Sequence, residues 1–243
     1  SIKRYIQMHL ERNESDKKDA GCICRYAIEQ RPAFWEMPDS AYFEGKQLYN
    51  TIREYAEQIK RFNNQLHSLK LLPVPSKDTI KSLEKINKQL EKQIQVLEVK
   101  LQTLLEQWQP EQLKSVGSIK GIGKRATAML IVFTQGFKYT HNHRQLISFA
   151  GLSPTEYSSG SSIHGKSRIY KRGGKNLRDV LYMCSMSAIK TNPACKALYE
   201  RLKANGKTGK QALIAVCNKL LKQVFAVVKN NSLYQPNYCS PKP

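Results

Sequence analysis

The sequence has no apolar run close to the roughly 20 residues that a membrane-spanning helix needs. Its first residues contain no apolar stretch of the kind found in a secretion signal. The six cysteines form no C-x-x-C pair, and the C-x-C at Cys22 and Cys24 is too isolated to indicate a metal site. We therefore expect a cytoplasmic protein with reduced, mostly buried thiols and no membrane partner.

Acidic residues are scarce in the second half of the chain. Residues 1–110 hold 18 Lys/Arg and 15 Asp/Glu, whereas residues 111–243 hold 22 Lys/Arg and only 4 Asp/Glu. Of the formal net charge of +21, the second half therefore carries +18. A compact domain so unbalanced repels itself unless a polyanion neutralises it, and nucleic acid is the usual polyanion. The alternative interpretation is a basic face that only aids solubility or meets an anionic membrane.

Two long stretches have the apolar period of helices. In residues 40–70, apolar side chains recur in steps of four and three, as in a heptad seam, and a proline-rich turn at 71–76 ends that helix. A second seam follows the turn and runs from Ile80 through Ile86 to Leu104. Two such helices joined by a short turn predict an antiparallel coiled-coil hairpin over residues 37–110. Its seam suits packing within the chain and pairing with another chain equally well.

The remaining sequence predicts shorter helices and one long loop. Helical patterns cover residues 111–116, 124–134, 143–150, 175–190, 194–204 and 208–229. The stretch from Gly151 to Lys175 has no helical period, and a loop of that length in a compact domain is usually functional or disordered. The tail at residues 236–243 is rich in proline and should be loose. These patterns predict a mostly α fold with a small helical domain over residues 111–235.

Two glycines mark a tight turn between two of the shorter helices. Gly121 and Gly123 flank Ile122, and Lys124 and Arg125 follow them. Such a turn exposes backbone N–H groups at a helix N-terminus, which attract phosphate, and the two cations reinforce that attraction. The segment resembles a helix-hairpin-helix DNA-binding element. The alternative interpretation is a glycine turn that only packing requires.

The long loop is rich first in serine and then in basic residues. Ser158 and Ser159 precede Gly160 on a flexible turn, from which a hydroxyl group can reach a phosphorus atom. The basic residues that follow can hold a phosphate and stabilise negative charge during attack, or they can simply grip phosphates. Between residues 166 and 178 there are six cations and no acid: Lys166, Arg168, Lys171, Arg172, Lys175 and Arg178.

Asp16 and Asp19 lie three residues apart in a segment that reads as a helix over residues 15–26. Residues i and i+3 share a helix face, and two carboxylates there can ligate Mg²⁺, which prefers oxygen ligands. Acidic residues also favour the first turn of a helix for electrostatic reasons alone. A solvated helix start is therefore the simpler interpretation of this pair.

Together these segments resemble the DEDD-type insertion-sequence transposases, the family that includes pilin-inversion recombinases and bridge-RNA-guided serine recombinases. The resemblance runs in order from about Leu113 to Tyr234, and an ordered series is far more specific than any one motif. The matching segments are the G-I-G turn at 121–123, Phe149-Ala150-Gly151-Leu152-x-Pro154, Ser159-Gly160, Ile169-x-Lys171-x-Gly173, Asn176-Leu177-Arg178, Gly206-Lys207 and the helix around 212–221. Upstream, Lys3-Arg4-Tyr5 and the segment 15–20 resemble the end of the family's RuvC-like nuclease domain.

The resemblance implies cleavage and rejoining of DNA strands. In the family, a RuvC-like fold holds Mg²⁺ with four acids, and a serine of the C-terminal domain forms a covalent phosphoserine link to DNA. By position, Asp16 and Asp19 correspond to the last two acids and Ser159 to the nucleophile, with Ser158 as the adjacent alternative. The resemblance also implies a structured guide RNA (a bridge RNA), a homo-oligomer that is a dimer or tetramer, and association with a bacterial nucleoid.

The sequence departs from the family at its beginning. The strands that would carry the first two acids do not appear in it, and residues 1–36 correspond to a remnant of the α/β RuvC-like domain. Mg²⁺ is therefore expected only if those acids are supplied. The first hypothesis is a transposase or site-specific recombinase, and the alternative is a truncated, non-catalytic protein for nucleic-acid binding and dimerisation. A third hypothesis, a coiled-coil scaffold with basic ends, predicts no nucleic-acid binding.

Overall fold

The computed structural model describes residues 5–6, 15–32, 34, 36–155, 158–159, 163–164, 168–169 and 173–236. The chain divides into two compact units, Ser1–Pro38 and Asp39–Pro243. The described residues are mostly helical, which confirms the predicted fold class in its coarse form. The second unit holds both the predicted hairpin and the helices after residue 110.

The first unit is built on one helix, α2, which spans Asp16–Gln30. Ser15 caps its start, because the serine hydroxyl accepts a hydrogen bond from a backbone N–H of the first turn. The helix continues past its expected end at Tyr26, whose ring meets the ring of Tyr5 edge-on. The Tyr5 hydroxyl donates a hydrogen bond to Oε2 of Glu29 at 2.6 Å, which connects Tyr5 to the last turn of α2. Among the described residues of this unit there is no strand, and the RuvC-like remnant stays a prediction.

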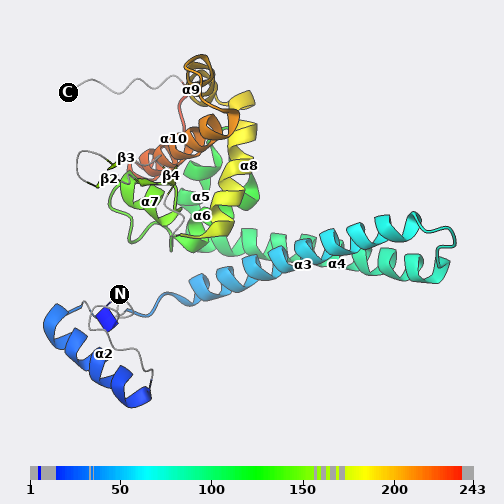
Figure 1. Cartoon of the computed structure of the whole chain (residues 1–243), viewed down its shortest axis with the longest axis horizontal. Helices are drawn as coiled ribbons and strands as arrows, with labels where there is room; N and C mark the ends of the chain where they lie inside the picture. Colours follow the sequence, from blue (N-terminus) through cyan, green and yellow to red (C-terminus); the bar gives the residue numbers. More distant parts are fainter. Residues whose placement is uncertain are drawn as a thin grey trace. The chain divides into compact units, whose positions relative to one another are not determined.

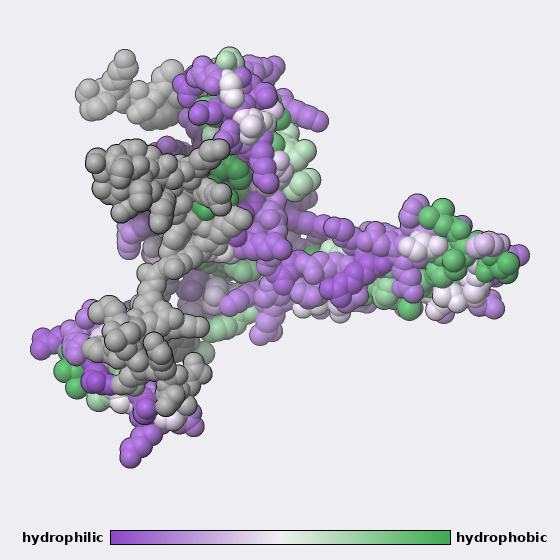
Figure 2. Space-filling view, viewed as in Figure 1, coloured by the Kyte–Doolittle hydropathy of each residue, from purple (hydrophilic) through white to green (hydrophobic). Residues whose placement is uncertain are grey.

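Two long helices, α3 (Ser40–Lys70) and α4 (Lys77–Trp108), pack against each other as an antiparallel pair (Figure 1). Both begin and end close to the predicted positions, and Ser76 caps α4 by accepting a hydrogen bond from the Thr79 N–H. The connecting turn is apolar and exposed, with Val74 88% accessible to solvent. Figure 2 shows hydrophobic residues gathered at this end of the otherwise hydrophilic pair.

The seam between α3 and α4 includes a polar residue that the sequence pattern did not predict. Asn87 is 7% exposed, whereas its neighbour Ile86, the predicted seam residue, is 38% exposed. Asn87 continues the alternating steps of three and four residues between Leu83 and Leu90, and its Nδ2 donates across the seam to Oδ1 of Asn63 at 2.9 Å. The assignment of Ile86 to the seam is therefore wrong. Coiled-coil packing of the pair stays a prediction.

In the described part of the second unit, six shorter helices follow the hairpin, and their bounds lie within one residue of those predicted. Proline occupies the first position of α5 and of α9, where its missing N–H costs no hydrogen bond. The three helices α8, α9 and α10 pack on one another, while α5 packs on α6 and α10. Their bounds are α5 Pro110–Gly117, α6 Lys124–Phe133, α7 His143–Phe149, α8 Lys175–Thr191, α9 Pro193–Ala204 and α10 Gly209–Lys229.

Helix α10 lies in the centre of this core. It contacts α5, α7, α8 and α9, and the residues Ala212, Val216, Leu220 and Val224 on its inner face have no exposed surface. Its length and hydropathy alone would also suit a membrane-spanning helix. The burial of this face against four other helices is a sufficient physical reason for its apolar composition.

The stretch after Gly151, predicted as a loop without helical period, contains two short antiparallel strand pairs. The pairs are nested along the chain, and we call the segment that holds these four strands the arm (residues 154–169). The sequence did not predict these strands, since each is only two residues long. Strand β1 (Pro154–Thr155) pairs with β4 (Arg168–Ile169), and β2 (Ser158–Ser159) pairs with β3 (Ile163–His164).

Candidate nucleic-acid interface

The glycine turn predicted to bind phosphate connects α5 to α6. Ile119 and Ile122, which are 1% and 7% exposed, anchor it in the core, and the Ile122 N–H donates to the Ile119 carbonyl at 3.1 Å. Gly123 is the N-cap of α6 in an extended conformation, and no side chain caps the first N–H groups of the helix. The start of α6 therefore presents backbone donors to solvent, as a phosphate site on a helix N-terminus requires.

The two glycines of this turn are required for different reasons. Gly121 has a φ of +99°, and a Cβ there would lie 2.6 Å from the Cβ of Ala188 on α8, so backbone conformation and packing both require glycine. Gly123 has open space where a Cβ would stand and an ordinary negative φ. The packing interpretation of the turn therefore accounts for Gly121, whereas Gly123 has no packing requirement and lies next to the exposed start of α6.

A buried asparagine holds the turn from behind. Asn192, the N-cap of α9, is 1% exposed, and its Nδ2 donates to the Lys120 carbonyl at 3.2 Å and to Oε1 of Gln223 at 3.0 Å. Its Oδ1 accepts from the Tyr234 hydroxyl at 2.9 Å and from the Cys195 N–H at 3.3 Å. Both donors and both acceptor positions of this side chain are thus used, which fixes the turn relative to α9 and α10.

The segment after α10 lies against the same turn. The Tyr234 N–H donates to Oγ of Ser118 at 2.8 Å, while its hydroxyl reaches Asn192. Burial raises the pKa of the Tyr234 hydroxyl, so this group stays a neutral donor at physiological pH. Sequence reasoning missed these contacts because 42 residues separate the two side chains. The only available signal was the Asn-Pro pair at 192–193, which is typical of a helix start.

The base of the arm is closed by backbone contacts. A Cβ on Gly173 would lie 2.6 Å from the Phe149 carbonyl oxygen and 2.7 Å from the Gly151 nitrogen, so only glycine fits there. Arg178 on α8 joins the two ends of the arm, because its Nη1 donates to the Ala150 carbonyl at 3.3 Å and to the Gly173 carbonyl at 3.1 Å. Arg178 therefore has a structural role at the arm's base, and its predicted phosphate contact stays a prediction.

The predicted serines and Arg168 lie in the strands of the arm, whereas Lys175 and Arg178 lie in α8. Ser159 stands in β2 opposite Ile163, the pair nearest the end of the arm, and Ser158 stands opposite His164. Arg168 lies in β4, and Lys175 is exposed in the first turn of α8. Lys166, Lys171 and Arg172 lie outside the described residues.

Helix α8 connects the arm to the glycine turn. Arg178 marks the arm's base on this helix, and Ala188 marks the contact with Gly121. Ten residues of α-helix separate the two, which corresponds to about 15 Å along the axis. The base of the arm and the glycine turn thus both contact α8. The spacing between these two contacts is shorter than one turn of a DNA duplex.

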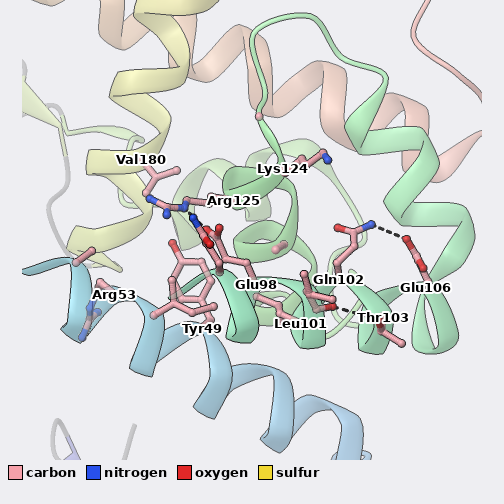
Figure 3. A pocket seen from close by; sticks show the side chains of 16 residues that line it. Tyr49, Arg53, Glu98, Leu101, Gln102, Thr103, Glu106, Lys124, Arg125 and Val180 are labelled. Atoms are coloured by element: carbon pink, nitrogen blue, oxygen red, sulfur yellow. Dashed lines mark hydrogen bonds and ion pairs between the residues drawn. The ribbon is translucent and has the colours of Figure 1, made fainter. Parts of the chain in front are cut away.

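A cavity of about 1000 Å³ lies beside the start of α6, between this helix and the hairpin. Arg125, predicted to contact nucleic acid, forms an ion pair there with Glu98 of α4 (Figure 3). Lys124 also lines the cavity and is exposed. Sequence patterns could not place Glu98 beside the glycine turn, since 27 residues separate it from Arg125.

Asp16 and Asp19 occupy the first turn of α2, as predicted. Asp16 is exposed and Asp19 is half-buried. Within the part of the chain that the structure describes, no group of three or more His, Cys, Asp or Glu residues could hold a metal ion. The two aspartates therefore do not form a complete Mg²⁺ site with other described residues, and their role as ligands stays a prediction.

The sequence was compared with known families and proteins. The family described as "Transposase IS116/IS110/IS902 family" matches residues 113–200. The "Pilin gene-inverting protein" of Moraxella lacunata is 28% identical over 240 residues, which are 95% of this chain and 70% of that protein, and its counterpart in Moraxella bovis has the same values. The "Insertion element IS110 uncharacterized 43.6 kDa protein" of Streptomyces coelicolor is 31% identical over 118 residues, 49% of this chain and 29% of that protein.

The matched family region begins in α5 and ends in α9. It therefore contains the glycine turn, the arm with Ser159, the whole of α8 and the buried Asn192. These are the elements whose geometry points to a nucleic-acid surface. Residues 113–200 are thus the part of the chain that is similar to the IS116/IS110/IS902 transposase family.

Proposed function

We propose that this protein is a DNA transposase or site-specific recombinase that cleaves and rejoins DNA strands through a phosphoserine intermediate on Ser159. The observation that carries the proposal is the match to pilin gene-inverting proteins, which covers 95% of the chain at 28% identity. The match of residues 113–200 to a transposase family supports it. The charge of +18 on residues 111–243 supports DNA as the partner. The protein would act in the cytoplasm, where bacterial DNA lies.

The arm gives Ser159 a suitable position for such chemistry. Its backbone lies in the inner of the two strand pairs, while α8 and Arg178 fix the base of the arm. A nucleophile on such an arm would meet the DNA backbone while the rest of the domain holds the phosphates. Lys124, Lys175 and the basic residues of 166–172 would hold these phosphates and offset the charge that develops during attack.

In the proposed step, the Ser159 Oγ loses its proton and forms a bond to phosphorus, while the bond from phosphorus to one deoxyribose oxygen breaks. That oxygen leaves with a proton. In rejoining, a DNA hydroxyl attacks the phosphoserine, and the serine oxygen leaves and regains its proton. One phosphate ester is formed for each one broken, so strand exchange needs no external energy source.

Mg²⁺ binding by Asp16 and Asp19 is part of the proposal only if further acids are supplied. A bound Mg²⁺ would lower the negative charge at the phosphate that is attacked. Two carboxylates three residues apart on α2 provide a partial ligand set and no more. A structured guide RNA and a dimeric or tetrameric assembly complete the proposal, because a domain with this positive charge can hold RNA and DNA backbones at once.

The experiment traps the covalent intermediate. The chain is expressed in bacteria, the cells are lysed in denaturant, and nucleic acid on the purified protein is digested with nuclease. Mass spectrometry should find a nucleotide remnant on the peptide that contains Ser159. Ser159→Ala should abolish the remnant, whereas the matched control Ser158→Ala should retain it. A remnant that persists in Ser159→Ala contradicts the nucleophile assignment, and RNA that co-purifies in the same preparation would support the guide.

A further inference from the structure

The cavity between the hairpin and the glycine turn has a charged centre. Arg125 of α6 and Glu98 of α4 form an ion pair there, although both are partly open to solvent, with 63% and 35% of their side chains exposed. Figure 3 shows Tyr49, Glu98 and Arg125 directed toward one another inside the cavity. A carboxylate of the hairpin thus occupies the space in front of the guanidinium group.

Tyr49 contributes an unused hydrogen-bond donor to the same place. Its side chain is 8% exposed and lines the cavity, and its ring packs edge-on against Phe133 at 5.5 Å between ring centres. Among the described residues, the fully buried side-chain atoms without a partner do not include its hydroxyl oxygen, and this group makes no hydrogen bond with them. The hydroxyl is therefore open to the cavity and available as a donor to a molecule that enters it. Burial raises the pKa of Tyr49, while the positive charges of Arg53 and Arg125 oppose the rise.

The first turn of α6 forms another wall of the cavity. Gly123, Lys124 and Arg125 line it, and no side chain caps the N–H groups of this turn. Free N–H groups, a lysine, an arginine and a phenol hydroxyl are all groups that bind a singly charged phosphate diester. The structure already shows that an anion is stable at this position, because the Glu98 carboxylate lies there.

We propose that the cavity between α3, α4 and α6 is a binding site for one phosphate of the nucleic-acid backbone, and that Glu98 fills its anion position in the free chain. The phosphate displaces Glu98, pairs with Arg125 and accepts a hydrogen bond from the Tyr49 hydroxyl. This inference rests on the proposed function and adds residues of the hairpin to the nucleic-acid interface. Because Glu98 is part of α4, phosphate binding also releases the one ion pair that the described residues form between the hairpin and α6.

The first test removes the competing carboxylate. Glu98→Gln should bind a labelled random-sequence DNA duplex about three- to tenfold more tightly than the unchanged chain at low salt, because the phosphate no longer displaces an anion. The matched control is Glu91→Gln, which removes the same charge from the same helix one heptad earlier, away from the cavity. It should change the affinity less than about twofold. Equal changes in the two variants would overturn the proposal, because they would show a general effect of net charge.

The second test removes the hydroxyl donor. Tyr49→Phe keeps the ring that packs on Phe133 and should weaken DNA binding about threefold to fivefold. The control Tyr55→Phe removes a hydroxyl from the same helix outside the cavity and should leave the affinity unchanged. Thermal melting of each variant confirms that the fold is intact. If Tyr49→Phe and Tyr55→Phe bind DNA as tightly as the unchanged chain, the phosphate site is wrong.

The outcomes separate this inference from the proposed function. If DNA binds but the Glu98 and Tyr49 variants match their controls, the cavity site fails while the recombinase proposal stands. If the unchanged chain does not bind DNA even at low salt, both fail. If the Ser159 adduct is absent while the cavity variants behave as expected, the phosphate site stands and the phosphoserine chemistry fails.

Discussion

The hairpin and the helices that follow it bury polar groups in different ways. In the hairpin, Asn87 makes one hydrogen bond to Asn63, and its own Oδ1 is buried without a partner. In the following helices, Asn192 uses both donors and both acceptor positions on groups from four separate segments. Each region also holds a further buried atom without a hydrogen-bond partner, Arg53 Nε in α3 and Asn218 Oδ1 in α10. The hairpin is stabilised mainly by a repeated apolar seam that tolerates the imperfect polar pair. The later helices depend on a few long-range contacts, each of which is hard to replace.

The largest expected difference between the two regions is in the stability lost when one glycine in each is replaced by alanine. Gly121→Ala should lower the free energy of unfolding by about 3 kcal/mol or more, because a left-handed backbone and a Cβ 2.6 Å from Ala188 cannot both be accommodated. Gly45→Ala in α3 should change it by less than about 1 kcal/mol, since helix propensity offsets a Cβ 3.2 Å from a Val132 methyl group. Urea denaturation of both variants measures the difference. Similar losses would show that the two regions are equally tolerant.

The next largest effect concerns the buried asparagine. Asn192→Ala should cost about 2–3 kcal/mol, because it leaves the Lys120 carbonyl and the Tyr234 hydroxyl without their partner. The same urea titration measures it. The matched control in the hairpin is Asn63→Ala, which removes the exposed partner of Asn87 and should cost less than about 1 kcal/mol. A loss below that of the control would contradict a central role for Asn192.

Two thiols of the later helices should make stability depend on pH. Burial raises the pKa of Cys195 and of Cys217 to about 11, whereas an unfolded thiol ionises near 8.5. Below the unfolded pKa both states are protonated, and the stability is fully present. As the pH rises from about 9 to 11, only the unfolded state loses protons, so stability should fall by up to about 1.4 kcal/mol per pH unit for each thiol. Cys217→Ala should flatten this slope, and an unchanged slope would exclude this thiol as its source.

The smallest expected effect is a gain in stability, from a substitution in the hairpin. Asn87→Leu should raise the free energy of unfolding by about 1 kcal/mol, because it replaces a half-satisfied polar group in the seam with an apolar one. Denaturation together with light scattering would measure stability and oligomeric state in one sample. A loss of stability would mean that the Asn87–Asn63 bond contributes more than its geometry indicates.

Much of the fold could be predicted from local patterns. In the second unit, proline at 110, serine at 76 and the apolar periods placed the helix ends within about two residues, because capping and proline act on the adjacent turn. The end of α2 was missed by four residues. The prediction of the seam was wrong at one position. The apolar pattern pointed to Ile86, whereas alternating steps of three and four residues point to Asn87, which is the buried residue. The spacing was the better signal, since helix geometry applies to polar and apolar side chains alike.

The candidate site could be predicted only in part. The composition and the motif order pointed to the glycine turn, Ser159 and the basic residues, and to the transposase family that residues 113–200 match. The partners of these residues could not be predicted. Glu98 beside Arg125, Asn192 behind Lys120 and Arg178 at the arm's base all come from segments that fold together over long sequence separations.

The sequence by itself determined the helical periods, the helix ends and the unequal distribution of charge, because each depends on neighbouring residues or on simple composition. Only the tertiary structure decided which cations remain open to a phosphate. Arg125 and Arg178 read as equivalent basic residues, yet one faces a carboxylate and the other holds two carbonyl groups. The physical reason is that a hydrogen bond or ion pair depends on separations of a few ångströms, which the packing of distant helices sets.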